Sequence, residues 1–312
     1  EDTFILKLQD KISEPGLDKT IVTGYEDDGT PIEVDAYTAA AGENVTFRLN
    51  SNIPEEWGED VIEYSYTEEG TVGHAKENGY TGYYFVYLGN SVQPIADKYY
   101  IVNSEPGDDC TFEVSVDLAA MYNDGVIKES DFGVTTISVS YNATLNENTV
   151  AGDYHNTAHV SYPGGHSEPD DVVVDTYQIE IFKHDQTTHA PLADAEFQLY
   201  QKDAEENVIE TSKVTLTSGS DGIALTKGLK AGTYYLKETK APEGYVCSDA
   251  EVTIVIPDQI DESTNIAHIE FANSLIPHTG GMGTTLFSIV GGALIATAGV
   301  VFVISRRRKA RA

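Results

Sequence analysis

Apolar and polar residues alternate in short runs along most of the chain. Residues 177–185, 195–202, 232–239, 250–257 and 265–273 all show this period of two, which is typical of half-buried β-strands. Turn-forming residues separate the runs at 218–222, 230–232 and 241–244. The first half of the chain repeats the pattern at 19–25, 42–50, 110–117, 134–146 and 156–163. We therefore expect an all-β protein built from tandem β-sandwich domains of immunoglobulin-like or prealbumin-like type.

One segment departs from the strand pattern. Residues 115–125 are the only stretch of the exposed part with helical spacing over about two turns. Residues 163–171, rich in Pro, Gly and acidic side chains, are interpreted as a linker between the two domains.

Three polar residues fall on strand faces that the alternation predicts to be buried. Lys183 follows Ile179 and Ile181 on one face, Glu238 shares a face with Tyr234 and Leu236, and Asn273 follows Ile269 and Phe271. A lone buried charge is costly unless it is paired. We expect the three side chains to meet in one core, either as an ion pair with a neighbouring amide or as a reactive group.

The last part of the sequence predicts a membrane segment. Residues 286–304 carry no charge, and nineteen helical residues span about 28 Å, close to the hydrocarbon thickness of a bilayer. The basic stub at 306–312 is expected on the cytoplasmic side, which places the acidic bulk outside. The alternative, a buried core helix, lacks any later segment to cover it.

Charge and composition narrow the function classes. With 51 acidic and 19 basic residues, the chain lacks the clustered positive charge that binding to nucleic acid requires. Cys110 and Cys247 lie far apart, which argues against a disulfide framework.

His155 and His159 have no accompanying carboxylate or cysteine pattern, so no metal and no cofactor is expected. The Tyr-rich stretch 77–89 is either a binding surface or a half-buried strand.

The end of the chain resembles the LPXTG class of sorting signals of Gram-positive surface proteins. The motif reads Ile276, Pro277, His278, Thr279 and Gly280, with Ile in place of the usual Leu, followed by the apolar span and the basic tail. The resemblance implies that a sortase attacks the Thr279 carbonyl and passes it to an amine of the peptidoglycan cross-bridge or of another pilin subunit. The membrane anchor would then be transient, and the mature protein would be attached to the cell wall.

Residues 177–274 resemble the SpaA-like, collagen-adhesin B-type domain. The matching features are Lys183 followed by "PLADAEFQLY", the stretch "YLKETKAPEGY" that contains Glu238, and Asn273 just before the sorting signal. The resemblance implies a spontaneous isopeptide bond between Lys183 and Asn273, with Glu238 as the helper acid. Burial favours the neutral forms of Lys and Glu, which suits an amine nucleophile and a proton shuttle. The bond forms once per molecule, so the protein is not expected to be an enzyme.

Residues 17–176 resemble the collagen-adhesin A-type middle domain of Gram-positive backbone pilins, on "GLDKTIV", "GENVTFRLNSNIP" and residues 139–162. The resemblance implies a second bond, between Lys19 and Asn156. The acid that usually assists this bond is missing at the expected place, residues 85–93. Asp97 and Glu63 are considered as substitutes for it. Lys7 stands where shaft pilins carry the lysine that accepts the next subunit, although the flanking Pro is absent.

The predicted organisation is therefore an N-terminal strand or linker at 1–16, two sandwich domains at 17–175 and 176–275, and a sorting signal at 276–312. The function expected is that of a wall-anchored structural protein, a pilin subunit delivered by sortase. A monomeric wall-anchored adhesin that uses the same domains as a stalk, with a host ligand on the first domain, is the alternative. If the sequence is a fragment, an enzyme with its catalytic domain before Glu1 is a third reading.

Overall fold

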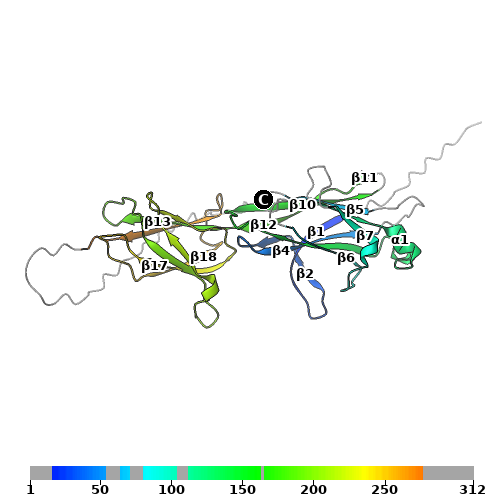
Figure 1. Ribbon diagram of the computed structural model, residues 1–312, viewed down its shortest axis with the longest axis horizontal. Coiled ribbons are helices and arrows are strands. Elements are labelled where there is room, and N and C mark those ends of the chain that lie inside the picture. Colours follow the sequence, from blue (N-terminus) through cyan, green and yellow to red (C-terminus); the bar gives the residue numbers. More distant parts are fainter. Residues whose placement is uncertain (1–15, 54–63, 71–79, 104–111, 163–164, 277–312) are drawn as a thin grey trace, which may run out of the picture. The chain divides into compact units, whose positions relative to one another are not determined.

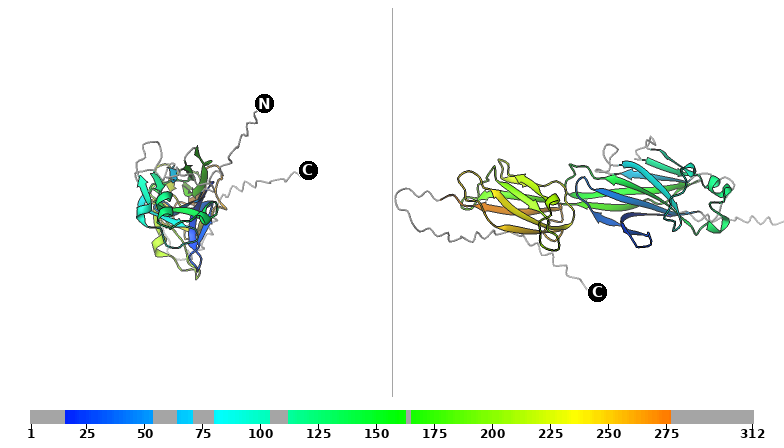
Figure 2. Two further views of the ribbon diagram at one scale, coloured as in Figure 1. Left: turned by 90° about the vertical axis from the view of Figure 1, so that its right-hand side faces the viewer. Right: turned by 60° about the horizontal axis from the view of Figure 1, so that its bottom comes forward.

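The computed structural model describes residues 16–53, 64–70, 80–103, 112–162 and 165–276. The chain divides into two compact units, the first made of residues 1–149 and 153–175 and the second of residues 150–152 and 176–312. Strands dominate the described part of both units (Figures 1 and 2), so the all-β prediction is confirmed. Lys7, residues 277–280, the apolar span 286–304 and the basic tail lie outside the described residues.

The first unit packs two sheets around one core. In the described residues, one sheet has the strand order β2-β1-β4-β9-β6, and the other has the order β3-β12-β10-β5-β8-β7 with β11 beside β10. The strands of the first sheet are β1 (Leu17–Tyr25), β2 (Pro31–Val34), β4 (Asn44–Asn52), β6 (Tyr80–Leu88) and β9 (Thr136–Thr144). Those of the second are β3 (Ala36–Thr38), β5 (Tyr64–Gly70), β7 (Tyr100–Asn103), β8 (Phe112–Val116), β10 (Gly152–Tyr162), β11 (Gly165–His166) and β12 (Asp170–Thr176).

The period of two in the sequence becomes an inner and an outer face in β4 and β9. Phe47 and Leu49 of β4 pair with Tyr141 and Val139 of β9, and all four are buried in the core of the first unit. The Phe47 and Tyr141 rings stack with centroids 5.3 Å apart. Intervening positions such as Arg48 point to the opposite face, because successive side chains of a strand alternate.

The helical spacing at 115–125 corresponds to a short helix, α1 (Leu118–Asn123). Asp117 begins it as an N-cap, since its carboxylate accepts a hydrogen bond from the Ala120 amide at 2.8 Å. Leu118 and Met121 anchor one side of the helix in the core. The remaining single turns of the described residues are η1 (Asp97–Tyr99), η2 (Glu129–Asp131) and η3 (Glu210–Ser212).

The second unit contains two smaller sheets in its described residues, with the orders β16-β13-β19 and β15-β14-β17-β18. Its strands are β13 (Gln178–Asp185), β14 (Glu196–Tyr200), β15 (Val214–Thr217), β16 (Ile223–Leu225), β17 (Gly232–Lys240), β18 (Glu251–Ile256) and β19 (Ile266–Asn273). The first strand β13 and the last strand β19 run parallel side by side over eight residue pairs. Side chains from both sheets form a single core.

The linker prediction for residues 163–171 is wrong. Gly165–His166 forms β11, and the strand β12 already begins at Asp170 and pairs with β3 in the first unit. The acidic residues that suggested a linker are taken up by the sheet: Asp170, for example, accepts a hydrogen bond from the backbone amide of Lys19 at 2.7 Å. The division between the units lies between Asp175 and Thr176, after the end of this segment.

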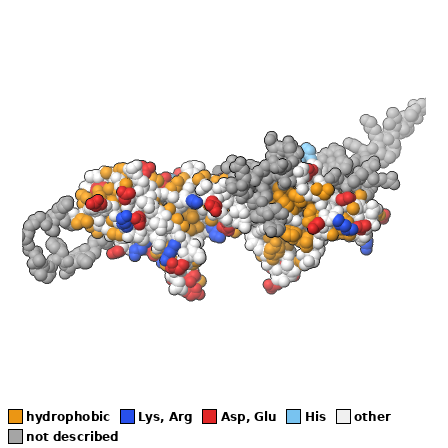
Figure 3. Space-filling view, in the orientation of Figure 1, with side chains coloured by type: hydrophobic (Ala, Val, Ile, Leu, Met, Phe, Trp, Pro, Cys, Tyr) orange, Lys and Arg blue, Asp and Glu red, His pale blue; other side chains and the backbone are white. Residues whose placement is uncertain are grey.

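Among the described residues, no helix is long and apolar enough to cross a membrane. On the face shown in Figure 3, Lys and Arg side chains are scattered singly among Asp and Glu rather than gathered into a basic patch.

Candidate functional site

Three buried polar residues of the second unit meet in the core between its two sheets. Lys183 lies on β13, Asn273 on the neighbouring strand β19, and Glu238 on β17 of the opposing sheet. Their side chains are almost completely shielded from solvent, with Lys183 and Asn273 0% exposed and Glu238 1% exposed. Alternation along each strand thus brings together the three residues that the sequence pattern singled out.

The carboxylate of Glu238 stands between the other two groups. Lys183 Nζ lies 3.0 Å from Glu238 Oε1, at ion-pair distance but without the alignment of a hydrogen bond. Asn273 Nδ2 donates a hydrogen bond to the same oxygen at 2.8 Å. The backbone amide of Ser248 donates to Oε2 at 2.7 Å and fixes the other side of the carboxylate.

Aromatic rings close the site off from water. The Lys183 Nζ lies 4.8 Å from the ring centroid of Phe271 and 5.9 Å from that of Phe197, and these two rings contact each other edge to face. Burial lowers the pKa of Lys183, and the negative charge of Glu238 opposes this only in part. The amine is therefore shifted toward its neutral, nucleophilic form.

The geometry suits an attack of the amine on the amide. Asn273 Oδ1 is buried and has no hydrogen-bond partner among the described residues, while Nδ2 already faces the carboxylate. Rotation of the amide by half a turn would exchange these atoms and present Oδ1 to Glu238, where a protonated carboxyl can donate to it. Glu238 is thus placed to assist at either atom of the amide.

A second buried Lys–Asn pair lies in the core of the first unit. The Lys19 Nζ on β1 donates a short hydrogen bond to Asn156 Oδ1 on β10, which joins the two sheets of this unit. Lys19 is 1% exposed and Asn156 0% exposed. The rings of Phe47 and Tyr141 lie 5.8 Å and 5.9 Å from the amine. The pair thus has the same composition and the same aromatic surroundings as the pair in the second unit.

Comparison with known families covers the second unit and the end of the chain. Residues 177–269 match the family described as "SpaA: Prealbumin-like fold domain", and residues 273–311 match the "LPXTG cell wall anchor motif". The chain carries a SpaA-type prealbumin-like domain and an LPXTG cell wall anchor.

Two curated proteins share parts of this sequence. The chain is 34% identical over 68 residues to "Collagen adhesin" from Staphylococcus aureus, and 35% identical over 79 residues to "Trypsin-resistant surface T6 protein" from Streptococcus pyogenes serotype M6. These segments make up 22% and 25% of this chain, but only 6% and 14% of the two relatives. The chain therefore matches a small part of each relative's length.

Solved structures share the fold of both units. The "group B streptococcus pilus 2b backbone protein" superposes with a TM-score of 0.57 at 23% identity, covering 82% of this chain and 97% of that one. The C-terminal fragment of the major pilin GBS80 of Streptococcus agalactiae gives 0.59 at 21% identity, covering 83% and 99%. The Corynebacterium diphtheriae major pilin SpaA gives 0.59 at 20% identity, covering 84% and 69%.

These matches bear on two parts of the chain. The end of the chain is similar to a cell wall anchor of the LPXTG class, and both units share the sandwich fold of the superposed Gram-positive pilins. The anchor implies processing by sortase and attachment to peptidoglycan. The expected sandwich fold and the expected location are thereby confirmed.

The sequence suggested Asp97 or Glu63 as the acid of the first pair. Asp97 is exposed at η1, where it accepts a hydrogen bond from the Tyr100 hydroxyl at 3.2 Å, so it does not reach the buried pair. Glu63 lies outside the described residues.

The remaining polar residues of interest have local structural roles. His155 forms an ion pair with Asp171 at 2.7 Å, which raises its pKa. Within the described ranges no cluster of His, Cys, Asp and Glu could hold a metal ion. Cys247 is an exposed free thiol, and Cys110 lies outside the described residues.

Proposed function

We propose that this protein is a pilin subunit whose two units are each locked by an intramolecular Lys–Asn isopeptide bond. The observation that carries the proposal is the buried group of Lys183, Glu238 and Asn273, in which the amine and the amide share one carboxylate oxygen. By its position and burial, the Lys19–Asn156 pair supports a second bond of the same kind.

The proposed reaction forms one C–N bond and breaks another. Transfer of a proton from the Lys183 ammonium to the Glu238 carboxylate leaves both groups neutral. The neutral Lys183 Nζ then attacks Asn273 Cγ, and the protonated Glu238 donates a hydrogen bond to the developing oxyanion. Glu238 then relays a proton from the attacking amine to Nδ2, which leaves as ammonia. The products are a secondary amide between the two side chains and one ammonia molecule. The reaction requires no oxidant, metal or cofactor. Each of the two sites reacts once per molecule.

The bond would join the first strand of the second unit to its last. The strands β13 and β19 are already neighbours, so the link needs no rearrangement of the sheet. It closes a loop of about 90 residues, and the chain-entropy description assigns such a closure about 4–5 kcal/mol of stability. Tension that enters at the sorting signal, just beyond β19, would then pass through a covalent bond.

Intact-mass measurement tests the proposal directly. The full chain should be lighter than its sequence by one ammonia for each bond, hence by two ammonia molecules. Glu238→Ala should restore one ammonia, and Asn156→Ala should restore the other. The control Glu270→Ala removes an exposed acid of β19 and should leave both bonds in place. A wild-type mass equal to that of the sequence contradicts the proposal.

The acceptor for polymerisation is a further part of the proposal. Lys7 is proposed as the amine that receives the Thr279 carboxyl of the next subunit, and both residues lie outside the described ones. If no subunit is transferred to Lys7, the same domains serve as the stalk of a monomeric wall-anchored adhesin.

A further inference from the structure

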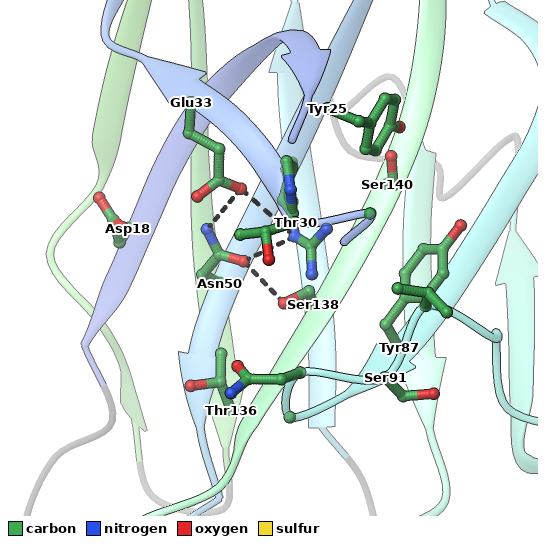
Figure 4. Close-up of a pocket in the computed structure, with 16 residues that line it drawn as sticks. Asp18, Tyr25, Thr30, Glu33, Asn50, Tyr87, Ser91, Thr136, Ser138 and Ser140 are labelled. Atoms are coloured by element: carbon green, nitrogen blue, oxygen red, sulfur yellow. Dashed lines mark hydrogen bonds and ion pairs between the residues drawn. The ribbon is translucent and has the colours of Figure 1, made fainter. Parts of the chain in front are cut away.

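The first unit carries a polar pocket on the outer face of the sheet β2-β1-β4-β9-β6, on the side away from the cross-linking core (Figure 4). Its volume is about 350 Å³, within the range of about 300–1,000 Å³ usual for small-molecule sites. The pocket follows a row of cross-strand neighbours, in which Asp18 pairs with Asn50, Asn50 with Ser138, and Ser138 with Tyr87.

The β1–β2 hairpin forms one wall of the pocket. Gly29 at its tip has a positive φ of 88°, and a Cβ at this position would come within 2.9 Å of Val92 in the loop after β6. The hairpin is held in shape by the Thr30 amide, which donates to Asp28 at 2.9 Å. Because Gly29 has no side chain, the tip of the hairpin can lie against Val92 on the other side of the pocket.

The floor of the pocket is fixed by a hydrogen-bonded network. Asn50 Oδ1 accepts from Arg48 Nε at 3.1 Å and from the Ser138 hydroxyl at 2.7 Å. The carboxylate of Glu33 lies 3.3 Å from the same Arg48 nitrogen. Because these groups hold one another, their remaining donors and acceptors are oriented before any ligand arrives.

Several of those remaining groups have no partner among the described residues. The contacts of Arg48 with Glu33 and Asn50 use only Nε, so its two terminal nitrogens keep their four N–H donors, although the side chain is only 12% exposed. Glu33 Oε2 and the buried Ser140 hydroxyl also make no hydrogen bond there. The pocket therefore offers both donors and acceptors at fixed positions.

Aromatic rings flank the polar floor. Figure 4 shows the rings of Tyr25 and Tyr87 on one side of the pocket, with Asp18, Glu33 and Asn50 on the other. Tyr25 is 63% exposed, and Tyr87 is held by the guanidinium of Arg48 at 5.3 Å from its centroid. An exposed ring beside a polar floor is suited to a ligand with one apolar face and several polar edges.

We propose that this pocket binds a neutral saccharide, of the size of a mono- or disaccharide. Sugar hydroxyls donate and accept at once, which matches the unused donors of Arg48 and the unused acceptor of Glu33. The C–H face of a pyranose ring packs on a tyrosine ring. This inference is independent of the cross-links, because the pocket lies on the other face of the sheet from Lys19.

The charges in the pocket favour a neutral ligand over an acidic one. Asp18 and Glu33 outnumber the single Arg48, and the whole chain has a formal net charge of −32. An apolar ligand is equally disfavoured, since Pro31 and Val92 are the only aliphatic side chains that line the pocket.

Titration of the full chain with lactose and N-acetyllactosamine, followed by saturation-transfer NMR, tests this proposal. We expect binding that weakens at least tenfold in Tyr25→Ala, which removes an exposed ring, and in Arg48→Lys, which keeps the charge but loses the paired N–H donors. Tyr122→Ala, which removes a partly exposed tyrosine of α1, should bind like the wild type. Thermal unfolding of each variant shows whether the fold is retained.

Three outcomes would overturn the proposal. These are the absence of binding by both neutral sugars at millimolar concentration, equal binding by the wild type and both pocket variants, and binding of 3′-sialyllactose or of a lysine-containing tetrapeptide in preference to the neutral sugars. None of these outcomes affects the intact mass, so the saccharide proposal and the cross-link proposal fail separately.

Discussion

At the scale of single residues, the protein places polar and ionisable side chains where ordinary sandwich cores have apolar ones. Lys183, Glu238 and Asn273 occupy core positions of three strands and are sealed by Phe197 and Phe271. Removing one partner of such a group leaves the others buried without compensation. The proposed isopeptide bond would replace the buried amine of Lys183 by an uncharged amide.

Asp185, two residues beyond Lys183, gives a prediction about pH. Its Oδ1 accepts hydrogen bonds from the Thr188 and Thr187 amides and from the Thr188 hydroxyl, which lowers its pKa from 3.8 to about 2. A lowered folded-state pKa means that its stabilising contribution is complete above pH 3.8 and is lost as the pH falls toward 2.

We therefore expect Asp185→Asn to lower the free energy of unfolding at pH 6 and to have a much smaller effect near pH 2. Denaturant unfolding of the wild type and the variant at both values checks this. The control Asp258→Asn changes an exposed turn acid that follows β18 and should leave the difference between the two pH values unchanged. An equal loss at both pH values for Asp185→Asn would contradict the assignment.

At the scale of elements, the strand β13 is held by more than its two neighbouring strands. The carbonyl of Gly222 accepts a hydrogen bond from the Lys183 amide at 2.7 Å. Gly222 has φ of 77°, and a Cβ there would lie 2.5 Å from the Lys183 carbonyl oxygen and 3.0 Å from Pro191. The turn before β16 thus fixes the backbone that carries Lys183.

Gly222→Ala should destabilise the second unit by about 2–5 kcal/mol, since left-handed strain is joined by a clash with backbone that cannot move freely. The matched control is Gly244→Ala, where φ is 85° but nothing lies within 4 Å of the new Cβ. That change should cost about 1–2 kcal/mol from strain alone. Thermal unfolding of both variants in a Lys183→Ala background separates these effects from the cross-link, and equal losses would contradict the packing argument.

At the scale of the whole molecule, the wall anchor and the cross-link lie close together in the sequence. Asn273 precedes Ile276, the first residue of the sorting motif, by three positions. Load from the wall would enter the second unit at the last strand, which is the strand that the proposed bond ties to β13. A chain attached in this way is suited to bear tension, whether it stands alone or in a polymer.

Cells that express the full chain together with its sortase allow a test of whether the subunits are polymerised. Wall extracts boiled in detergent should give a ladder of high-mass bands, because the bonds between subunits are covalent. Lys7→Ala should abolish the ladder, whereas Lys128→Ala, which removes an exposed lysine of the first unit, should leave it intact. A single band in the wild type excludes the pilin role and leaves the monomeric adhesin.

The sequence by itself determined the strand content, the order of the sorting signal and the three inward polar residues of the second unit. These follow from local alternation and from short motifs, which need no knowledge of which strands are neighbours. Only the tertiary structure decided that residues 170–176 belong to a sheet rather than a linker, and that Arg48, Tyr25 and Tyr87 frame a pocket. The physical reason is that pairing and register join residues far apart in the chain, and alternation alone does not specify the partner strand.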